Sequence, residues 1–226
     1  MIRALRVARS TALKARTQAA NAMQALVVTA PDQLRQSLRG LSKIELVRTC
    51  ARSRPGKLAG TTAATKAALR SLAVRHEALE AEVKALDGEI GPLIATTAPE
   101  LLAVFGVGPD TAGALLVAAG DNPDRLRSDA AFSMLCGSSP VEASSGKVTR
   151  HRVNRGGDRQ ANAALYRIVL VRLRHHEPTQ DYMRRRTTEG KSKPEIIRCL
   201  KRYVAREIYA VLCIMAVRAG LADVAA

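Results

Sequence analysis

The fold is decided by residues 61–97, which read TTAATKAALRSLAVRHEALEAEVKALDGEIGPLIATT. Apolar residues recur here at alternating steps of three and four, with one histidine in the same line: Leu69, Leu72, His76, Leu79, Val83, Leu86, Ile90 and Leu93. A seam sustained for over three heptads predicts a long helix that packs as a left-handed coiled coil. His76 is interpreted as a polar seam residue that sets the register, because no second metal ligand is spaced to join it. Gly88, Gly91 and Pro92 are expected to weaken the C-terminal end of this helix.

Further helices are predicted on both sides of this stretch, wherever apolar and charged residues recur between glycine and proline breaks. Their expected bounds are residues 2–28, 32–39, 43–52, 99–105, 109–119, 128–136, 157–176, 178–189 and 193–220. No run of alternating strands is present, and only residues 147–153 are a candidate for a short hairpin arm. The sequence therefore predicts a mainly α protein. A helical and coiled-coil half is expected at 1–98, and a compact helical domain at 99–226.

The charge of the chain is large and unevenly distributed. Its 36 Lys and Arg residues exceed its 20 Asp and Glu residues, for a net charge of +16. Residues 1–57 carry +10 and residues 147–226 carry +11, whereas the stretch between them is acidic. Solvated helix faces are one explanation. A polyanionic partner is the favoured one, because self-repulsion on this scale does not help a compact fold.

Composition excludes several classes of protein. Aromatic residues make up only 3% of the chain, without a tryptophan, which argues against a stacking platform for single-stranded bases. No apolar run approaches the ~20 residues that span a bilayer, and the N-terminus lacks a secretory signal. The four cysteines form no CxxC pair, so we expect reduced thiols in a cytoplasmic protein with no metal site of its own.

A glycine-containing turn between two apolar helices is the first candidate site. Residues 101–112 read LLAVFGVGPDTA, which is the pattern of a helix-hairpin-helix. Gly106, Val107 and Gly108 are candidate DNA-binding residues, because backbone N–H groups at a helix N-terminus can contact a phosphate. The alternative is a tight turn without a ligand, which the nearby charges of Asp110 and Asp121 favour.

A serine-containing loop and a basic loop follow each other between residues 136 and 159. The serine loop, CGSSPVEASSGK, is on its own typical of a polar turn, and no Asp-His relay is near it in sequence. The basic loop, KVTRHRVNRGGDR, is a candidate phosphate-binding segment, with Asp158 as the cap of the next helix. Its candidate DNA-binding residues are Lys147, Arg150, Arg152, Arg155, Gly156, Gly157 and Arg159. A solvated loop is the alternative.

The last helix and the segment before it carry many cations. These are Arg184, Arg185, Arg186, Lys191, Lys193, Arg198, Lys201, Arg202 and Arg206. Apolar residues such as Ile197, Leu200 and Val204 run along the same helix. We therefore expect an apolar face toward the core and a basic face outward, as a wall that contacts phosphates.

Four stretches together resemble the C-terminal transposase domain of the IS110 family of bacterial insertion-sequence transposases. They are GVGPDTAGALL, DNPDRLRSDAAFSMLCGSSPVEASSGK, RHRVNRGGDRQANAALYRIVLVRLR and KSKPEIIRCLKRYVAREIY, in that order within residues 99–212. The resemblance implies a recombinase function in DNA transposition, with double-stranded DNA as partner and, in some members, a structured bridge RNA. The coiled coil implies a homo-oligomer, and no membrane is implied.

The resemblance also implies a nucleophile. The family serine lies five residues after a proline and just before a glycine, and Pro140, Ser145 and Gly146 fit that spacing. Ser145, rather than Ser144, is therefore the expected catalytic residue. The family pairs this domain with an N-terminal RuvC-like domain whose four acidic residues bind metal. Residues 1–98 are similar instead to the tail of that domain and the family's linker.

The expected activity follows from that difference. Mg²⁺ is expected only with a RuvC-like domain, so this chain is expected to hold no cofactor and to be inactive alone, as a truncated reading frame or remnant. Two alternatives stay open. One is a non-catalytic nucleic-acid-binding module that acts on a full-length relative. The other is a structural helical protein whose charge is incidental.

Overall fold

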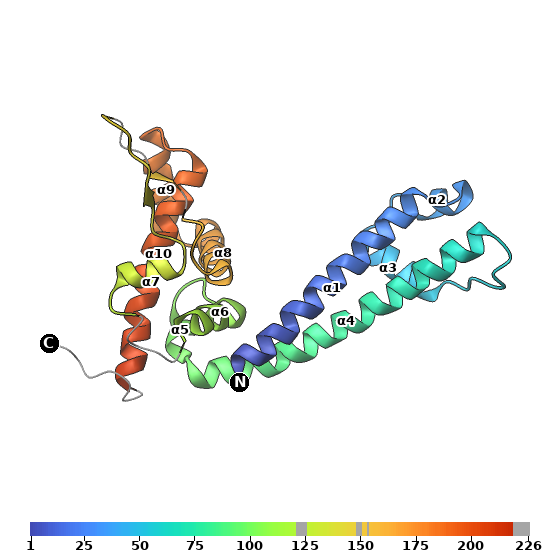
Figure 1. Ribbon diagram of the computed structural model, residues 1–226, viewed down its shortest axis with the longest axis horizontal. Helices are drawn as coiled ribbons and strands as arrows, with labels where there is room; N and C mark the ends of the chain where they lie inside the picture. Colours follow the sequence, from blue (N-terminus) through green and yellow to red (C-terminus); the bar gives the residue numbers. More distant parts are fainter. Residues whose placement is uncertain (121–125, 148–150, 153, 219–226) are drawn as a thin grey trace. The chain divides into compact units, whose positions relative to one another are not determined.

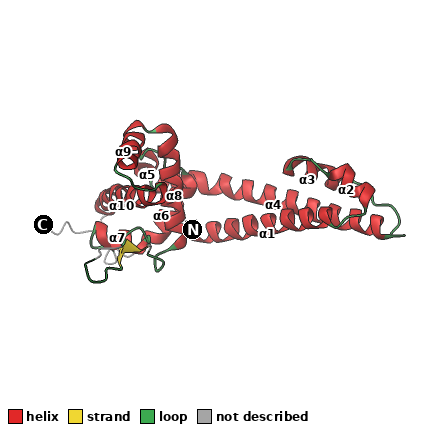
Figure 2. Ribbon diagram, turned by 90° about the horizontal axis from the view of Figure 1, so that it is seen from above, coloured by secondary structure: helices red, strands yellow, loops and turns green. Residues whose placement is uncertain are grey.

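A computed structural model describes residues 1–120, 126–147, 151–152 and 154–218. Arg150, one of the candidate DNA-binding residues, lies outside this range. Ten helices and a two-stranded ladder lie within it, so the mainly α prediction is confirmed (Figures 1 and 2). The chain divides into two compact units, residues 3–89 and 90–226, and the division falls inside a helix. The expected domains, 1–98 and 99–226, stay a prediction.

The first unit consists of α1 (Ile2–Val28), α2 (Asp32–Leu38), α3 (Lys43–Arg52) and most of α4 (Thr61–Thr97). Its helices begin and end where the sequence predicts. Ser42 and Glu45 form a capping box at the start of α3, with reciprocal side-chain to backbone hydrogen bonds. Glycine and proline did not end α4, which continues through Pro92 to Thr97. Packing explains this, because Ile90 and Ile94 around that proline are buried.

The heptad seam packs within the chain. Helices α1 and α4 run antiparallel side by side (Figure 1), and Arg9 pairs with Asp87 while Arg16 pairs with Glu80. Near the far end of this hairpin, α2 and α3 cover a cluster of buried residues: Met23, Ala30, Leu34, Leu38, Leu46, Val47, Cys50, Leu69 and Ala73. The seam residue His76 is half-buried, and its pKa is lowered by burial and by the nearby cations of Arg16 and Lys43.

The second unit holds the remaining helices around one core. They are α5 (Pro99–Ala103), α6 (Pro109–Ala119), α7 (Asp129–Leu135), α8 (Arg159–His175), α9 (Glu177–Thr188) and α10 (Lys193–Arg218). Helix α8 packs on α6, and α10 packs on α7, α8 and α9. Leu115, Phe132, Leu165, Ile168 and Ile208 are fully buried between them.

One short hairpin interrupts these helices. Strand β1 (Val141–Glu142) pairs antiparallel with β2 (His151–Arg152), with Val141 opposite Arg152. Of the expected hairpin arm at 147–153, residues 151–152 form a strand that pairs with the serine loop, and 148–150 and 153 lie outside the described residues. The four cysteines are free, as expected, and two of them, Cys50 and Cys136, are buried. Across the described helices, none is long and apolar enough to cross a membrane.

Candidate nucleic-acid interface

The glycine turn at 106–108 and the basic loop that contains Gly156 and Gly157 contact different parts of α8. Gly106 has a φ of +83°, and a Cβ at this position would lie 3.3 Å from the carbonyl oxygen of Ile168 and 3.4 Å from Cγ of Arg172. The basic loop instead ends at Arg159, the first residue of α8. Ile168 lies nine positions after Arg159 on α8, which is ~14 Å along the axis. The structure does not bring the two candidate segments together.

In the turn at 106–108, one of the backbone N–H groups that could bind a phosphate already donates a hydrogen bond within the protein. The Gly108 N–H donates to Oγ1 of Thr111 at 3.0 Å, and the side chain of Val107 is buried. Asp110, in the first turn of α6, pairs with Arg167 at 2.5 Å. A carboxylate at this helix N-terminus repels a phosphate, and Gly106 is explained by its packing on α8. A DNA-binding role for this turn stays a prediction.

The turn at Gly137, between α7 and the serine loop, is held tightly by the start of α8. Gly137 follows α7 with a φ of +63°, in the left-handed region that favours glycine. Nδ2 of Asn162 donates to the carbonyl oxygens of Cys136 and Gly137 at 2.8 and 2.9 Å. The N–H of Asp158 donates to the carbonyl oxygen of Leu135 at 2.6 Å. These bonds fix the serine loop and the basic loop to one another at their ends.

Asp158 caps α8 as predicted. Its Oδ1 accepts hydrogen bonds from the N–H groups of Gln160 and Ala161, both at 2.8 Å. The carboxylate is thus directed at the helix N-terminus. The basic residues on either side of it, Arg155 and Arg159, are exposed.

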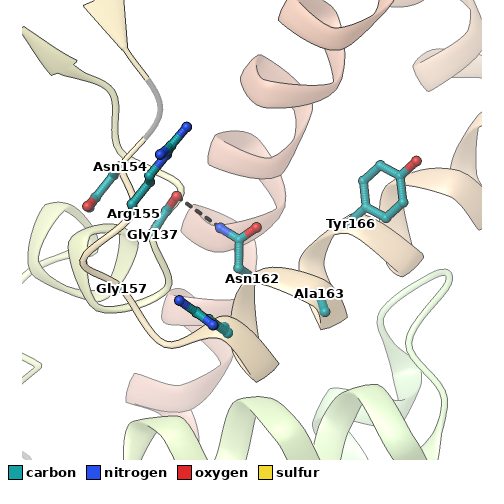
Figure 3. A pocket seen from close by; sticks show the side chains of 8 residues that line it. Gly137, Asn154, Arg155, Gly157, Asn162, Ala163 and Tyr166 are labelled. Atoms are coloured by element: carbon teal, nitrogen blue, oxygen red, sulfur yellow. Dashed lines mark hydrogen bonds between the residues drawn. The ribbon is translucent and has the colours of Figure 1, made fainter. Parts of the chain in front are cut away.

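An open hollow of about 370 Å³ lies at this junction (Figure 3). It is lined by Gly137, Asn154, Arg155, Gly157, Arg159, Asn162, Ala163 and Tyr166. Asn162 and Tyr166 are not among the residues predicted from the sequence. The signal was present, because Arg159, Asn162, Ala163 and Tyr166 recur at helical spacing and so share one face of α8.

Four cations of the basic segment have no carboxylate within 4.0 Å among the described residues: Lys147, Arg152, Arg155 and Arg159. All four are exposed. Ser145 and Gly146 are also exposed, in the connection between the two strands. The β1–β2 pairing therefore places the expected nucleophile and the unpaired Arg152 on one hairpin.

The C-terminal cations differ from the expectation of a uniform outward basic face. Arg184 pairs with Asp181 and Arg186 pairs with Glu189. Arg202 and Arg206 both contact Asp129, whose pKa their hydrogen bonds and charges lower. Lys201 was expected to point outward, but it is buried. Much of this positive charge is therefore neutralised or enclosed by the protein.

Within the described ranges, no three His, Cys, Asp or Glu side chains cluster in a way that would hold a metal ion. The described residues therefore supply no three-ligand set for the Mg²⁺ that the family resemblance implies.

Comparison with known proteins finds a family match to part of the second unit. Residues 98–184, from the end of α4 into α9, match the model of the Transposase IS116/IS110/IS902 family. This stretch of the chain is similar to the transposase domain of that family. The hollow, the serine hairpin and the four unpaired cations all lie within the matched residues. Among curated proteins, no match to this chain is found.

Proposed function

We propose that this chain binds double-stranded DNA as part of an insertion-sequence transposase, through the segment from Lys147 to Arg159. The observation that carries the proposal is the unpaired charge of that segment within the matched domain. Some cations elsewhere in the second unit, such as Arg184 and Arg206, have carboxylate partners, and others, such as Arg174 and Arg198, have none within 4.0 Å among the described residues. The segment from 147 to 159 differs in its density of such charge, since Lys147, Arg152, Arg155 and Arg159 all lack a carboxylate partner among the described residues. Gly156 and Gly157 allow the backbone to approach a phosphate beside them.

Ser145 is the proposed nucleophile. Its Oγ would form a bond to phosphorus while the bond from phosphorus to the leaving deoxyribose oxygen breaks. The hydroxyl proton passes to a base, and the leaving oxygen takes up a proton. Arg152 and Arg155 would offset the charge on the phosphoryl oxygens. A serine hydroxyl needs activation by a base or a metal ion, so this step is expected to require a RuvC-like domain with its acidic residues.

Salt-dependent binding tests the proposal. With ~6 phosphates neutralised, the log–log slope of affinity against salt on duplex DNA is about −5. The double variant Arg152→Glu, Arg155→Glu should flatten this slope. A matched control, Arg184→Glu with Arg218→Glu, makes the same change of charge at exposed arginines that already have acidic partners. A wild-type slope near zero, or equal effects of the two double variants, would contradict the proposal.

The alternative is a nucleic-acid-binding module without chemistry. It predicts the same salt dependence with no covalent adduct under any condition. A structural role with incidental charge predicts little affinity at physiological salt. The bridge RNA and the homo-oligomer stay predictions, and binding to a structured RNA is measured in the same titration.

A further inference from the structure

Lys201 is a buried cation in the middle of α10. Only 8% of the residue is exposed, and its Nζ donates a hydrogen bond of 3.0 Å to Oδ1 of Asn162 on α8. Asn162 in turn holds the carbonyl oxygens of Cys136 and Gly137. The side chain that accepts from Lys201 is thus also one that lines the hollow (Figure 3).

The charge of Lys201 has no counter-ion in the described protein. No carboxylate of the described residues lies within 4.0 Å of Nζ. The charged side chain that acts on the pKa of Lys201 is another cation, Arg198. Burial, followed by the repulsion from Arg198, lowers the pKa of Lys201. A largely buried ammonium group without a counter-ion costs folding free energy.

Arg172 shows what the same fold does with a structural buried cation. It is also 8% exposed, but its Nη1 donates to Glu207 at 2.7 Å and its Nε donates to the carbonyl oxygen of Phe105 at 2.9 Å. Lys201 has one neutral acceptor in place of that carboxylate. Lys201 therefore lacks the carboxylate partner that the other buried cation, Arg172, has.

The hollow, like the surroundings of Lys201, contains no acidic side chain among its lining residues. Arg155 and Arg159 line it. Asp158, between them in sequence, uses its carboxylate to cap α8. Two guanidinium groups at the surface and an ammonium group behind them leave a site that an anion with several oxygen acceptors would complete.

We propose that this hollow is a phosphate-binding subsite, in which Arg155 and Arg159 contact the phosphoryl oxygens and Lys201, behind Asn162, supplies a buried positive charge that the phosphate neutralises. That the phosphate belongs to a nucleic-acid strand rests on the proposed function. Lys201 lies outside the residues that match the family, so the assignment concerns this chain's own α10. In this arrangement Lys201 is a positioning and electrostatic residue, and it need not touch the ligand.

The proposal has a signature that a structural role would not produce. Replacing Lys201 by methionine removes the buried charge and keeps the length of the side chain. The urea midpoint of the unliganded protein should then stay the same or rise, whereas affinity for a duplex should fall about tenfold and the salt slope should lose about one unit. The control is Lys84→Met, which removes an exposed positive charge from α4, outside the candidate binding segments, and should change neither quantity appreciably.

Two further measurements distinguish loss of phosphate binding from loss of folding. Arg159→Gln is an exposed change at the first residue of α8 and should lower duplex affinity similarly without unfolding the protein. Titration of the wild-type chain with inorganic phosphate should shift the amide NMR signals of Gly137 and Gly157 and the side-chain amide of Asn162, and Lys201→Met should weaken these shifts.

The outcomes separate this inference from the proposed function. Normal duplex binding by Lys201→Met, or destabilisation by it together with unchanged phosphate shifts, would overturn the inference and leave DNA binding intact. If the wild-type chain fails to bind DNA but phosphate shifts these amides, the proposed function fails and the phosphate subsite is supported. Absence of any phosphate-induced shift in the wild-type chain would overturn the subsite.

Discussion

Gly157 crosses Gly137 so closely that a Cβ on Gly157 would lie 2.2 Å from the backbone nitrogen of Gly137 and 2.4 Å from its Cα. Real Cβ atoms do not approach backbone atoms at such distances, so this crossing requires glycine at position 157. It joins the turn after α7 to the loop before α8, and the hollow lies between them.

Gly157→Ala should therefore destabilise the second unit by ~1–3 kcal/mol, because the added carbon forces the two loops apart. Nucleic-acid affinity should fall with it. Gly156→Ala is the matched control, since a Cβ there would meet only Oδ1 of Asn154, at 3.4 Å. Urea unfolding of both variants measures the difference. Equal stability of the two alanine variants would show that the crossing is looser than described.

Val83 tests the packing of α1 on α4. Its side chain is 5% exposed in the heptad seam, so Val83→Asp should place an unpaired charge against α1 and cost several kcal/mol, ~3–5. Ala85→Asp adds the same charge at an exposed position of the same helix and should be nearly neutral. Urea unfolding of the two variants is the measurement, and a similar loss in both would argue against the seam.

The half-buried seam residues Leu79 and Leu86 test assembly. If the expected homo-oligomer uses the rest of this seam, the double variant Leu79→Asp, Leu86→Asp should sediment as a smaller species than the wild type. An unchanged sedimentation coefficient in a folded double variant would show that the seam serves only the intramolecular hairpin.

His76 should make stability depend on pH. Burial, with Arg16 and Lys43 nearby, lowers its pKa in the folded protein below the ordinary value of 6.5, despite the opposing charges of Glu77 and Glu80. The unfolded chain then binds the proton more readily, so this contribution to stability is complete above pH 6.5 and is lost as the pH falls through the folded pKa. His76→Leu should reduce the loss of stability between pH 7.5 and pH 5. A pH dependence identical to that of the wild type would contradict this role.

Ser145 should carry the chemistry when the acidic domain is supplied. The unfused chain should not cut DNA in the presence of Mg²⁺. Fusion of a relative's RuvC-like domain ahead of Met1 should give a covalent protein–DNA adduct, which Ser145→Ala should abolish and Ser144→Ala should largely retain. Denaturing gels of labelled DNA measure the adduct. An adduct that survives Ser145→Ala would show that the nucleophile is another residue.

The positions of the helices could be predicted because their signals are local. The period of the seam residues, Pro99 and Pro109 at the starts of α5 and α6, and the cap at Asp158 all act within a few residues. The match to the transposase family was predictable for a similar reason, since its motifs are contiguous stretches of sequence.

The sequence by itself thus determined the fold class, nearly every helix boundary and the basic segment before α8. Only the tertiary structure decided which cations are available. Lys201 and Arg202 are neighbours on α10, yet one faces Asn162 and the other Asp129, because each helix position meets a different partner helix. It also decided that Gly157 meets Gly137 while Gly106 meets Ile168 at a different place on α8. Such contacts join residues 20 or more positions apart, and helical periodicity, which repeats every few residues, carries no information about them.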